Sequence, residues 1–132
     1  MKSIIQKENK RRLFLPLTMC FLLAAASSPS FAGEADVIDV KIVKSSTDMY
    51  RVSVTIAHED EGWDHYADKW DVLDAEGNLL GTRVLMHPHE TEQPFTRSLS
   101  LSIPMNVEKV TIRAHDKVHG YGGKEMTVPV TQ

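Results

Sequence analysis

The chain has 132 residues, of which 15 are Lys or Arg, 18 are Asp or Glu, six are His and one is Cys. Residues 1–32 hold five of the basic residues and one of the acidic ones, so residues 33–132 keep 10 basic and 17 acidic residues and a formal charge of −7. This length fits one domain, and an acidic surface argues against nucleic acid as a partner because it cannot attract a phosphate backbone.

The first 32 residues have the pattern of a secretory signal peptide. A basic flank, Lys10–Arg12, precedes the apolar run Leu13–Ala26, and small residues occupy positions 30 and 32. This order of segments predicts export, with cleavage between Ala32 and Gly33. The alternative is an uncleaved anchor, but the apolar run is shorter than the roughly 18 residues that a membrane span needs. We therefore expect a periplasmic or secreted protein without a membrane anchor after cleavage.

Cys20, the single cysteine, lies inside this segment. A lipidated cysteine follows a small residue, and Met19 occupies that position, so we expect no lipid anchor. Cleavage after Ala32 would leave a mature chain without cysteine and thus without disulfides. Its expected first residues, Gly33-Glu34-Ala35, lack the third-place histidine of the usual amino-terminal copper site.

Residues 33–132 alternate between apolar and polar side chains, which is the period of a half-buried strand. The clearest case is the end of the segment 95–103, where Leu99, Leu101 and Ile103 alternate with serines. Seven strands are expected, at residues 38–42, 50–56, 70–72, 79–86, 95–103, 110–114 and 126–130. Seven short strands in about 100 residues predict an all-β fold, an antiparallel immunoglobulin-like or fibronectin-like sandwich, with Trp70 as its buried tryptophan.

All six histidines fall within or beside three expected loops, residues 58–67, 86–95 and 115–123. Because chain direction alternates from strand to strand, these loops should emerge at the same end of the sandwich. Imidazoles from separate loops can close around one transition-metal ion. The first-choice ligands are His87, His89, His115 and His119, and the further candidates are His58 and His65.

Carboxylates in the same loops are candidates for ligating the metal or orienting the histidines, namely Asp64, Glu90 and Asp116. Without a thiolate, copper or zinc is favoured over iron. Two alternatives remain open. The histidines can form a structural or pH-sensitive polar network, or the loops can bind a periplasmic protein partner through Trp63 and Tyr121.

Two short stretches resemble superoxide reductases, which are immunoglobulin-like iron proteins. The stretch from His65 to Trp70 is similar to their H-Y-x-x-W motif, with three residues in place of two between Tyr66 and Trp70. The stretch from Asp116 to Gly120 is similar to their C-N-x-H-G motif. The resemblance implies His119, His65 and His58 as iron ligands. Asp116, however, stands where that family has its ligating cysteine, whose thiolate sets the reactivity of the iron. The sequence thus favours a non-enzymatic metal-binding protein, with a partner-binding module second and a redox metal site third.

Overall fold

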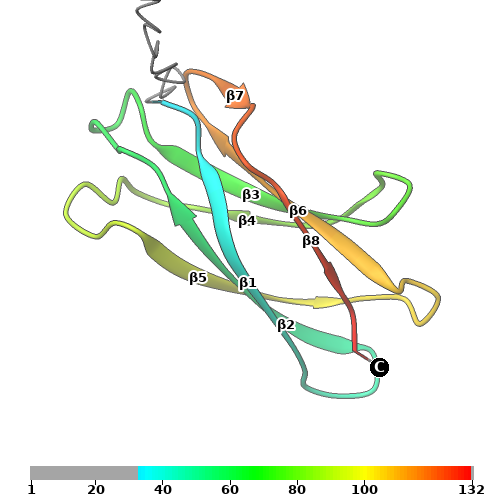
Figure 1. The fold of residues 1–132 in the computed structure, drawn as a ribbon. Coiled ribbons are helices and arrows are strands. Elements are labelled where there is room, and N and C mark those ends of the chain that lie inside the picture. Colours follow the sequence, from blue (N-terminus) through cyan, green and yellow to red (C-terminus); the bar gives the residue numbers. More distant parts are fainter. Residues whose placement is uncertain (1–32, 132) are drawn as a thin grey trace, which may run out of the picture.

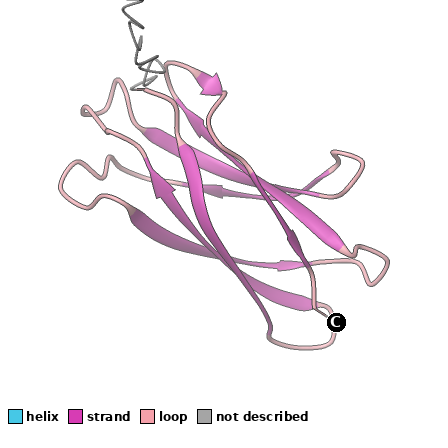
Figure 2. Ribbon diagram, in the orientation of Figure 1, coloured by secondary structure: helices cyan, strands magenta, loops and turns pink. Residues whose placement is uncertain are grey.

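The structure is a computed structural model that describes residues 33–131 (Figure 1). The predictions for residues 1–32, which concern the signal peptide, its cleavage site and Cys20, lie outside the described residues. Between residues 33 and 131 the regular secondary structure is entirely strand (Figure 2). In this part of the chain no helix has the length and apolar character needed to cross a bilayer.

The strands form two antiparallel sheets. One sheet has the order β1-β2-β5 and consists of β1 (Asp36–Lys44), β2 (Met49–Ala57) and β5 (Phe95–Ser102). The other has the order β4-β3-β6-β7, with β8 also paired to β6. Its strands are β3 (Ala67–Leu73), β4 (Leu79–Val84), β6 (Lys109–Asp116), β7 (Gly120–Tyr121) and β8 (Met126–Pro129).

These two sheets confirm the predicted all-β sandwich. Each of the seven expected segments overlaps one of the strands β1 to β6 and β8, although the bounds differ: β3 begins at Ala67 instead of residue 70, and β4 ends at Val84 instead of residue 86. The additional strand, β7, has two residues and arises because the chain turns back after β6, so that Tyr121 pairs with His115 and Gly120 with Asp116. Gly120 permits this reversal, since its φ of 70° lies in the left-handed region that favours glycine.

The core lies between the sheets and is filled by every second side chain of the strands. In β2, Val52, Val54 and Ile56 are fully buried, and Trp70 of β3 is fully buried as predicted. Burying an aliphatic or aromatic side chain of this size contributes about 1.5–3 kcal/mol each. Residues 33–131 contain no cysteine, so this burial takes the place of cross-links in stabilising the described domain.

The three histidine-containing loops lie at the same end of the sandwich, as the alternating strand direction predicted. Figure 1 shows the β2–β3, β4–β5 and β6–β7 connections together at the left and upper left of the view. The beginning of the described chain, at residue 33, reaches this same end (Figure 1). This end therefore brings four separate segments within reach of one another.

Candidate metal centre

In two strands, the series of inward-facing side chains continues beyond the apolar core and ends in buried polar side chains. Successive inward residues of β6 are Val110, Ile112, Ala114 and then Asp116, which is fully buried. In β2 the same period leads from Ile56 to His58, two residues beyond it, whose side chain is also fully buried. The alternation of strand side chains, which buries valine and isoleucine elsewhere, here buries an imidazole and a carboxylate.

His65, from the β2–β3 loop, joins these two residues. One potential ligand atom from each of His58, His65 and Asp116 lies within 4.8 Å of the others. The Nε2 atom of His58 is 3.9 Å from Asp116 Oδ2, and the Nε2 atom of His65 is 3.4 Å from Asp116 Oδ1. The two imidazole rings meet edge to face, with centroids 5.0 Å apart.

His119 lies at the open side of this group. Its Nδ1 atom is 3.3 Å from Asp116 Oδ1, its ring centroid is 5.1 Å from that of His65, and its side chain is 40% exposed. We refer to His58, His65, Asp116 and His119 together as the His–Asp centre. Three imidazoles and one carboxylate form a donor set that borderline divalent transition metals accept.

A neighbouring carboxylate fixes the orientation of His58. Its Nδ1 atom donates a hydrogen bond to Asp60 Oδ1, and this directs Nε2 toward Asp116. Asp60 is itself held in place because it accepts the backbone N–H groups of Ala67, at 3.0 Å, and of His89, at 2.6 Å. A carboxylate behind an imidazole is the usual way to set the tautomer and ring angle of a metal-ligating histidine.

The carboxylate of Asp116 uses only one of its oxygens within the described residues. Oδ1 accepts the backbone N–H groups of Val118 and His119, at 2.8 and 2.7 Å. Oδ2 is buried and has no hydrogen-bond partner in the described part of the chain. A buried carboxylate oxygen without a partner is costly, and a cation between Oδ2 and His58 Nε2 would satisfy it.

The backbone of Gly33 closes the centre on another side. Its carbonyl oxygen lies 2.9 Å from His58 Nε2 and 3.2 Å from His65 Nε2. Both ring nitrogens of His58 therefore face oxygen acceptors, Gly33 O and Asp60 Oδ1. A neutral imidazole carries a single N–H, so a His58 that donates from Nδ1 to Asp60 keeps the lone pair of Nε2 available to a cation.

The other first-choice histidines lie elsewhere at the same end. His115 is one residue before Asp116 and so points to the opposite face of β6, where its Nδ1 atom contacts Asp68 at 2.6 Å and its ring packs against Tyr121. The structure therefore does not bring His115 into the His–Asp centre.

His87 and His89 form a pair in the β4–β5 loop, with ring centroids 4.6 Å apart. The ring of His89 is buried and stacked on Phe95 at 4.0 Å, while His87 is exposed. Burial lowers the pKa of His89 below its ordinary value, and the positive charges of Arg97 and His87 lower it further. Asp60 separates this pair from the centre, since its two oxygens face His58 and His89 respectively.

None of the remaining candidates belongs to the His–Asp centre. Asp64 and Glu90 are exposed, and Trp63 is 63% exposed. Tyr121 donates a hydrogen bond from its hydroxyl to Asp71 at 2.6 Å and lies under the guanidinium of Arg113, so it belongs to a polar cluster on the outer face of its sheet. Asp60 and Gly33, which both touch histidines of the centre, were not among the sequence candidates.

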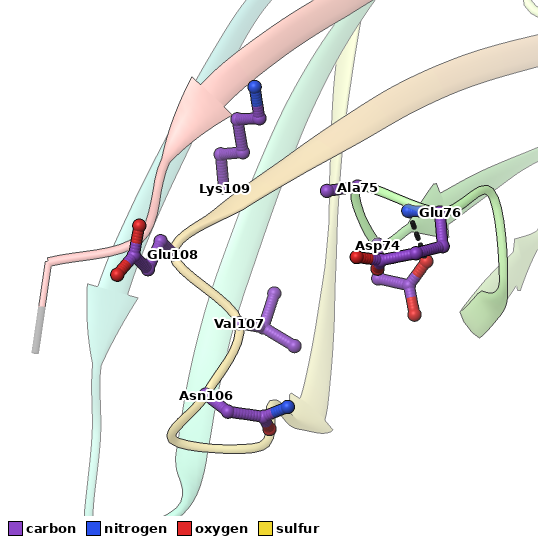
Figure 3. Close-up of a pocket in the computed structure, with 7 residues that line it drawn as sticks. All are labelled: Asp74, Ala75, Glu76, Asn106, Val107, Glu108 and Lys109. Atoms are coloured by element: carbon purple, nitrogen blue, oxygen red, sulfur yellow. Dashed lines mark hydrogen bonds between the residues drawn. The ribbon is translucent and has the colours of Figure 1, made fainter.

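A surface pocket lies away from the histidine loops (Figure 3). Figure 1 shows the two connections that form it at the opposite end of the sandwich. The pocket is formed by the β3–β4 turn and the β5–β6 connection, and its lining residues are Asp74, Ala75, Glu76, Asn106, Val107, Glu108 and Lys109. No histidine lines it, and Asp74 is occupied in holding its own turn through Glu76 and Asn78. The candidate metal ligands among the described residues therefore lie at the other end of the sandwich, with the histidine loops.

The fold and the site together define a β-sandwich with a His/Asp group able to hold a metal ion. A protein of Halomicrobium mukohataei named "Putative lipoprotein" is 44% identical to this chain over 95 residues, which make up 72% of this chain and 47% of that protein. The chain thus spans about half the length of this curated relative. No family model matches the chain.

Proposed function

We propose that this protein is an exported, non-enzymatic β-sandwich protein that binds one divalent transition-metal ion, copper or zinc, at the His–Asp centre. The observation that carries the proposal is the buried Oδ2 atom of Asp116, which has no hydrogen-bond partner in residues 33–131 and faces the Nε2 atom of His58. His65 and His119 supply further nitrogens, and Asp60 fixes the tautomer of His58.

The donor set supports copper or zinc over iron. It offers imidazole nitrogens and a carboxylate oxygen, and Cu(II) binds such ligands more tightly than the other first-row divalent ions. The same positions are those that the resemblance to superoxide reductases implies, with Asp116 in place of the family's cysteine. Because that thiolate gives the iron its redox reactivity, its replacement by a carboxylate favours binding of a metal over redox chemistry.

Export is supported by two independent features. Residues 1–32 have the order of a signal peptide, and the H. mukohataei relative carries the name "Putative lipoprotein". Met19 before Cys20 argues against lipidation of this chain, so the proposal places cleavage between Ala32 and Gly33.

We further infer that the sandwich is of the immunoglobulin-like kind. Its first, second and fifth strands form one sheet, while the third, fourth, sixth and eighth lie in the other. This is the partition expected when the chain crosses between two sheets in the immunoglobulin manner.

The test is metal binding by the untagged protein purified from an exporting host. We expect near-stoichiometric copper or zinc by elemental analysis, and titration of the stripped protein should give a dissociation constant well below about 10 μM. His65→Ala and His119→Ala should weaken binding strongly. His115→Ala is the matched control, because this imidazole lies in the same segment of chain but faces Asp68. Binding no tighter than about 10 μM, or equal losses in all three variants, would contradict the proposal.

A second candidate function, docking of a protein partner, is supported by exposed apolar side chains around the same loops. Trp63, Met86 and Val118 are 63%, 74% and 59% exposed. The side chain of Lys117, the neighbour of Val118, donates a hydrogen bond to the Trp63 carbonyl at 3.0 Å and so links two of these loops. Trp63→Ala should leave metal binding unchanged and abolish binding of the protein partner. His119→Ala should weaken metal binding and leave binding of the partner unchanged.

A further inference from the structure

We propose that Gly33, as the first residue of the mature chain, is itself a ligand, and that its α-amino nitrogen and its carbonyl oxygen bind the ion of the His–Asp centre together. This inference rests on the proposed metal site and on cleavage after Ala32. It adds a role for signal cleavage, which would create one of the ligands.

The carbonyl oxygen of Gly33 already occupies a ligand position. It lies 2.9 Å from His58 Nε2 and 3.2 Å from His65 Nε2, the two nitrogens that face Asp116. Gly33 is buried, so its backbone forms a wall of the centre. An ion placed among these two nitrogens and the Asp116 carboxylate would also contact this oxygen.

The identity of residue 33 fits this close approach. A Cβ atom at this position would lie 3.0 Å from Nδ1 and from Nε2 of His119, and closer still to its Cε1 atom. The φ of Gly33, 147°, is also one that side-chain-bearing residues rarely adopt. A side chain at residue 33 would therefore be strained and would have to displace the ring of His119.

The segment that follows Gly33 is fixed to the rest of the sandwich. The Val37 N–H donates to the carbonyl of Lys124 at 2.8 Å, and the Lys124 N–H donates to Asp36 Oδ1 at 2.7 Å. Ala35 is buried in the core and lies close to Gly123. A side chain at residue 123 would overlap the carbonyl group of Ala35. Gly33 is thus held against the centre by packing two to four residues away.

The chemistry of a free amino terminus completes the argument. An α-amine and the carbonyl oxygen of the same residue close a five-membered ring around a metal ion, and the amine must be deprotonated to bind, as other nitrogen ligands must. In the precursor this nitrogen is part of a peptide bond. Cleavage at Ala32 would therefore convert a carbonyl contact into a two-atom chelate and add a nitrogen to the imidazole set.

The first step of the test is the intact mass of the exported protein, which we expect to correspond to residues 33–132. A second protein carries one extra alanine inserted after Ala32, so that the mature chain begins one residue before Gly33. We expect it to bind Cu(II) about tenfold more weakly or worse, a loss at least as large as that caused by disturbing an outer-shell partner. Its Cu(II) electron paramagnetic resonance spectrum should show a weaker ligand field. Glu34→Gln, in a protein that begins at Gly33, is the matched control and should leave both quantities unchanged.

A chemical measurement separates ligation from any change in folding. In the protein that begins at Gly33, saturating Zn(II) should protect the α-amine from carbamoylation by cyanate, while His119→Ala should reduce this protection. Equal Cu(II) affinity and identical spectra with and without the extra alanine would overturn the inference and leave the His–Asp centre standing. A mature chain that begins at another residue, such as Cys20, would also overturn the inference and leave the His–Asp centre standing. A protein that begins at Gly33 and binds no metal would overturn both proposals.

Discussion

The carboxylate of Asp60 accepts the backbone N–H of His89 at 2.6 Å and thereby joins the β2–β3 loop to the β4–β5 loop. Its other oxygen accepts the backbone N–H of Ala67, where β3 begins, and a hydrogen bond from the ring of His58. A single buried carboxylate thus determines both the course of two loops and the orientation of one imidazole of the His–Asp centre.

Replacing Asp60 should therefore affect stability and metal binding together. Asp60→Ala leaves two buried backbone N–H groups without their acceptor, which should lower the free energy of unfolding by about 2–4 kcal/mol. It should also weaken metal binding about 10- to 100-fold, since His58 loses its orienting partner. Urea unfolding and metal titration measure the two effects. Glu59→Ala, at an exposed neighbouring position, should change neither.

Asp71 should make the protein sensitive to acid. Burial by itself would raise the pKa of this carboxyl group, but hydrogen bonds from Thr82, Tyr121 and Arg113, together with the charge of Arg113, lower it below its ordinary value of 3.8. As the pH falls, the unfolded chain then takes up a proton at Asp71 before the folded protein does. The stabilisation is complete above pH values near 3.8 and is lost as the pH falls through the folded-state pKa.

Urea midpoints of the wild type and of Asp71→Asn, measured from pH 7 to pH 2.5, check this prediction. The advantage of the wild type should be largest near neutrality and should shrink below about pH 4. Asp39→Asn, at an exposed position of β1, is the control and should show no comparable difference. A constant gap between wild type and Asp71→Asn at all pH values would count against the argument.

His89 should destabilise the fold in mild acid. Burial, together with the nearby charges of Arg97 and His87, lowers the pKa of His89 below the ordinary 6.5. As the pH falls, the unfolded chain therefore binds a proton at this residue before the folded protein does. Stability should therefore fall as the pH drops below about 6.5. His89→Leu keeps an apolar contact with Phe95 and removes this proton. The variant should lose less stability between pH 7 and pH 5 than the wild type, as measured by urea midpoints.

The close approach of Gly123 to the beginning of β1 gives a steric prediction. A Cβ atom at residue 123 would overlap the carbonyl oxygen of Ala35 and lie 2.6 Å from its carbonyl carbon, and backbone atoms cannot move aside cheaply. Gly123→Ala should lower the free energy of unfolding by about 1–3 kcal/mol. It should also weaken metal binding by displacing Gly33. Gly122→Ala is a matched control, because its Cβ would meet only the flexible end of Glu34.

The strands and the meeting of the histidine loops were predictable because both follow from local alternation. The same alternation also indicates which side chains at the end of β6 face the core. Even-numbered residues face inward from Val110 to Asp116, so Asp116 points into the end of the core and His115 points away from it. In the first sheet, the inward series that includes Ile56 continues through His58 to Asp60.

The part played by Gly33 was not predictable in this way. Its position depends on contacts between residues 35–37 and residues 123–124, which are almost 90 residues apart in sequence. No local pattern encodes such a contact. The pairing of His89 with Phe95 and Asp60 likewise depends on how the β4–β5 loop folds back, which strand periodicity does not specify.

His58 extends from β2 and Asp116 ends β6, so the two residues belong to opposite sheets of the sandwich. An ion held by both would be a reversible staple between the sheets, in a domain whose residues 33–131 include no cysteine to form a permanent one. By mass action, free metal at 100 times its dissociation constant would add about 2.7 kcal/mol to the free energy of unfolding. The durability of the domain would then follow the metal content of its surroundings.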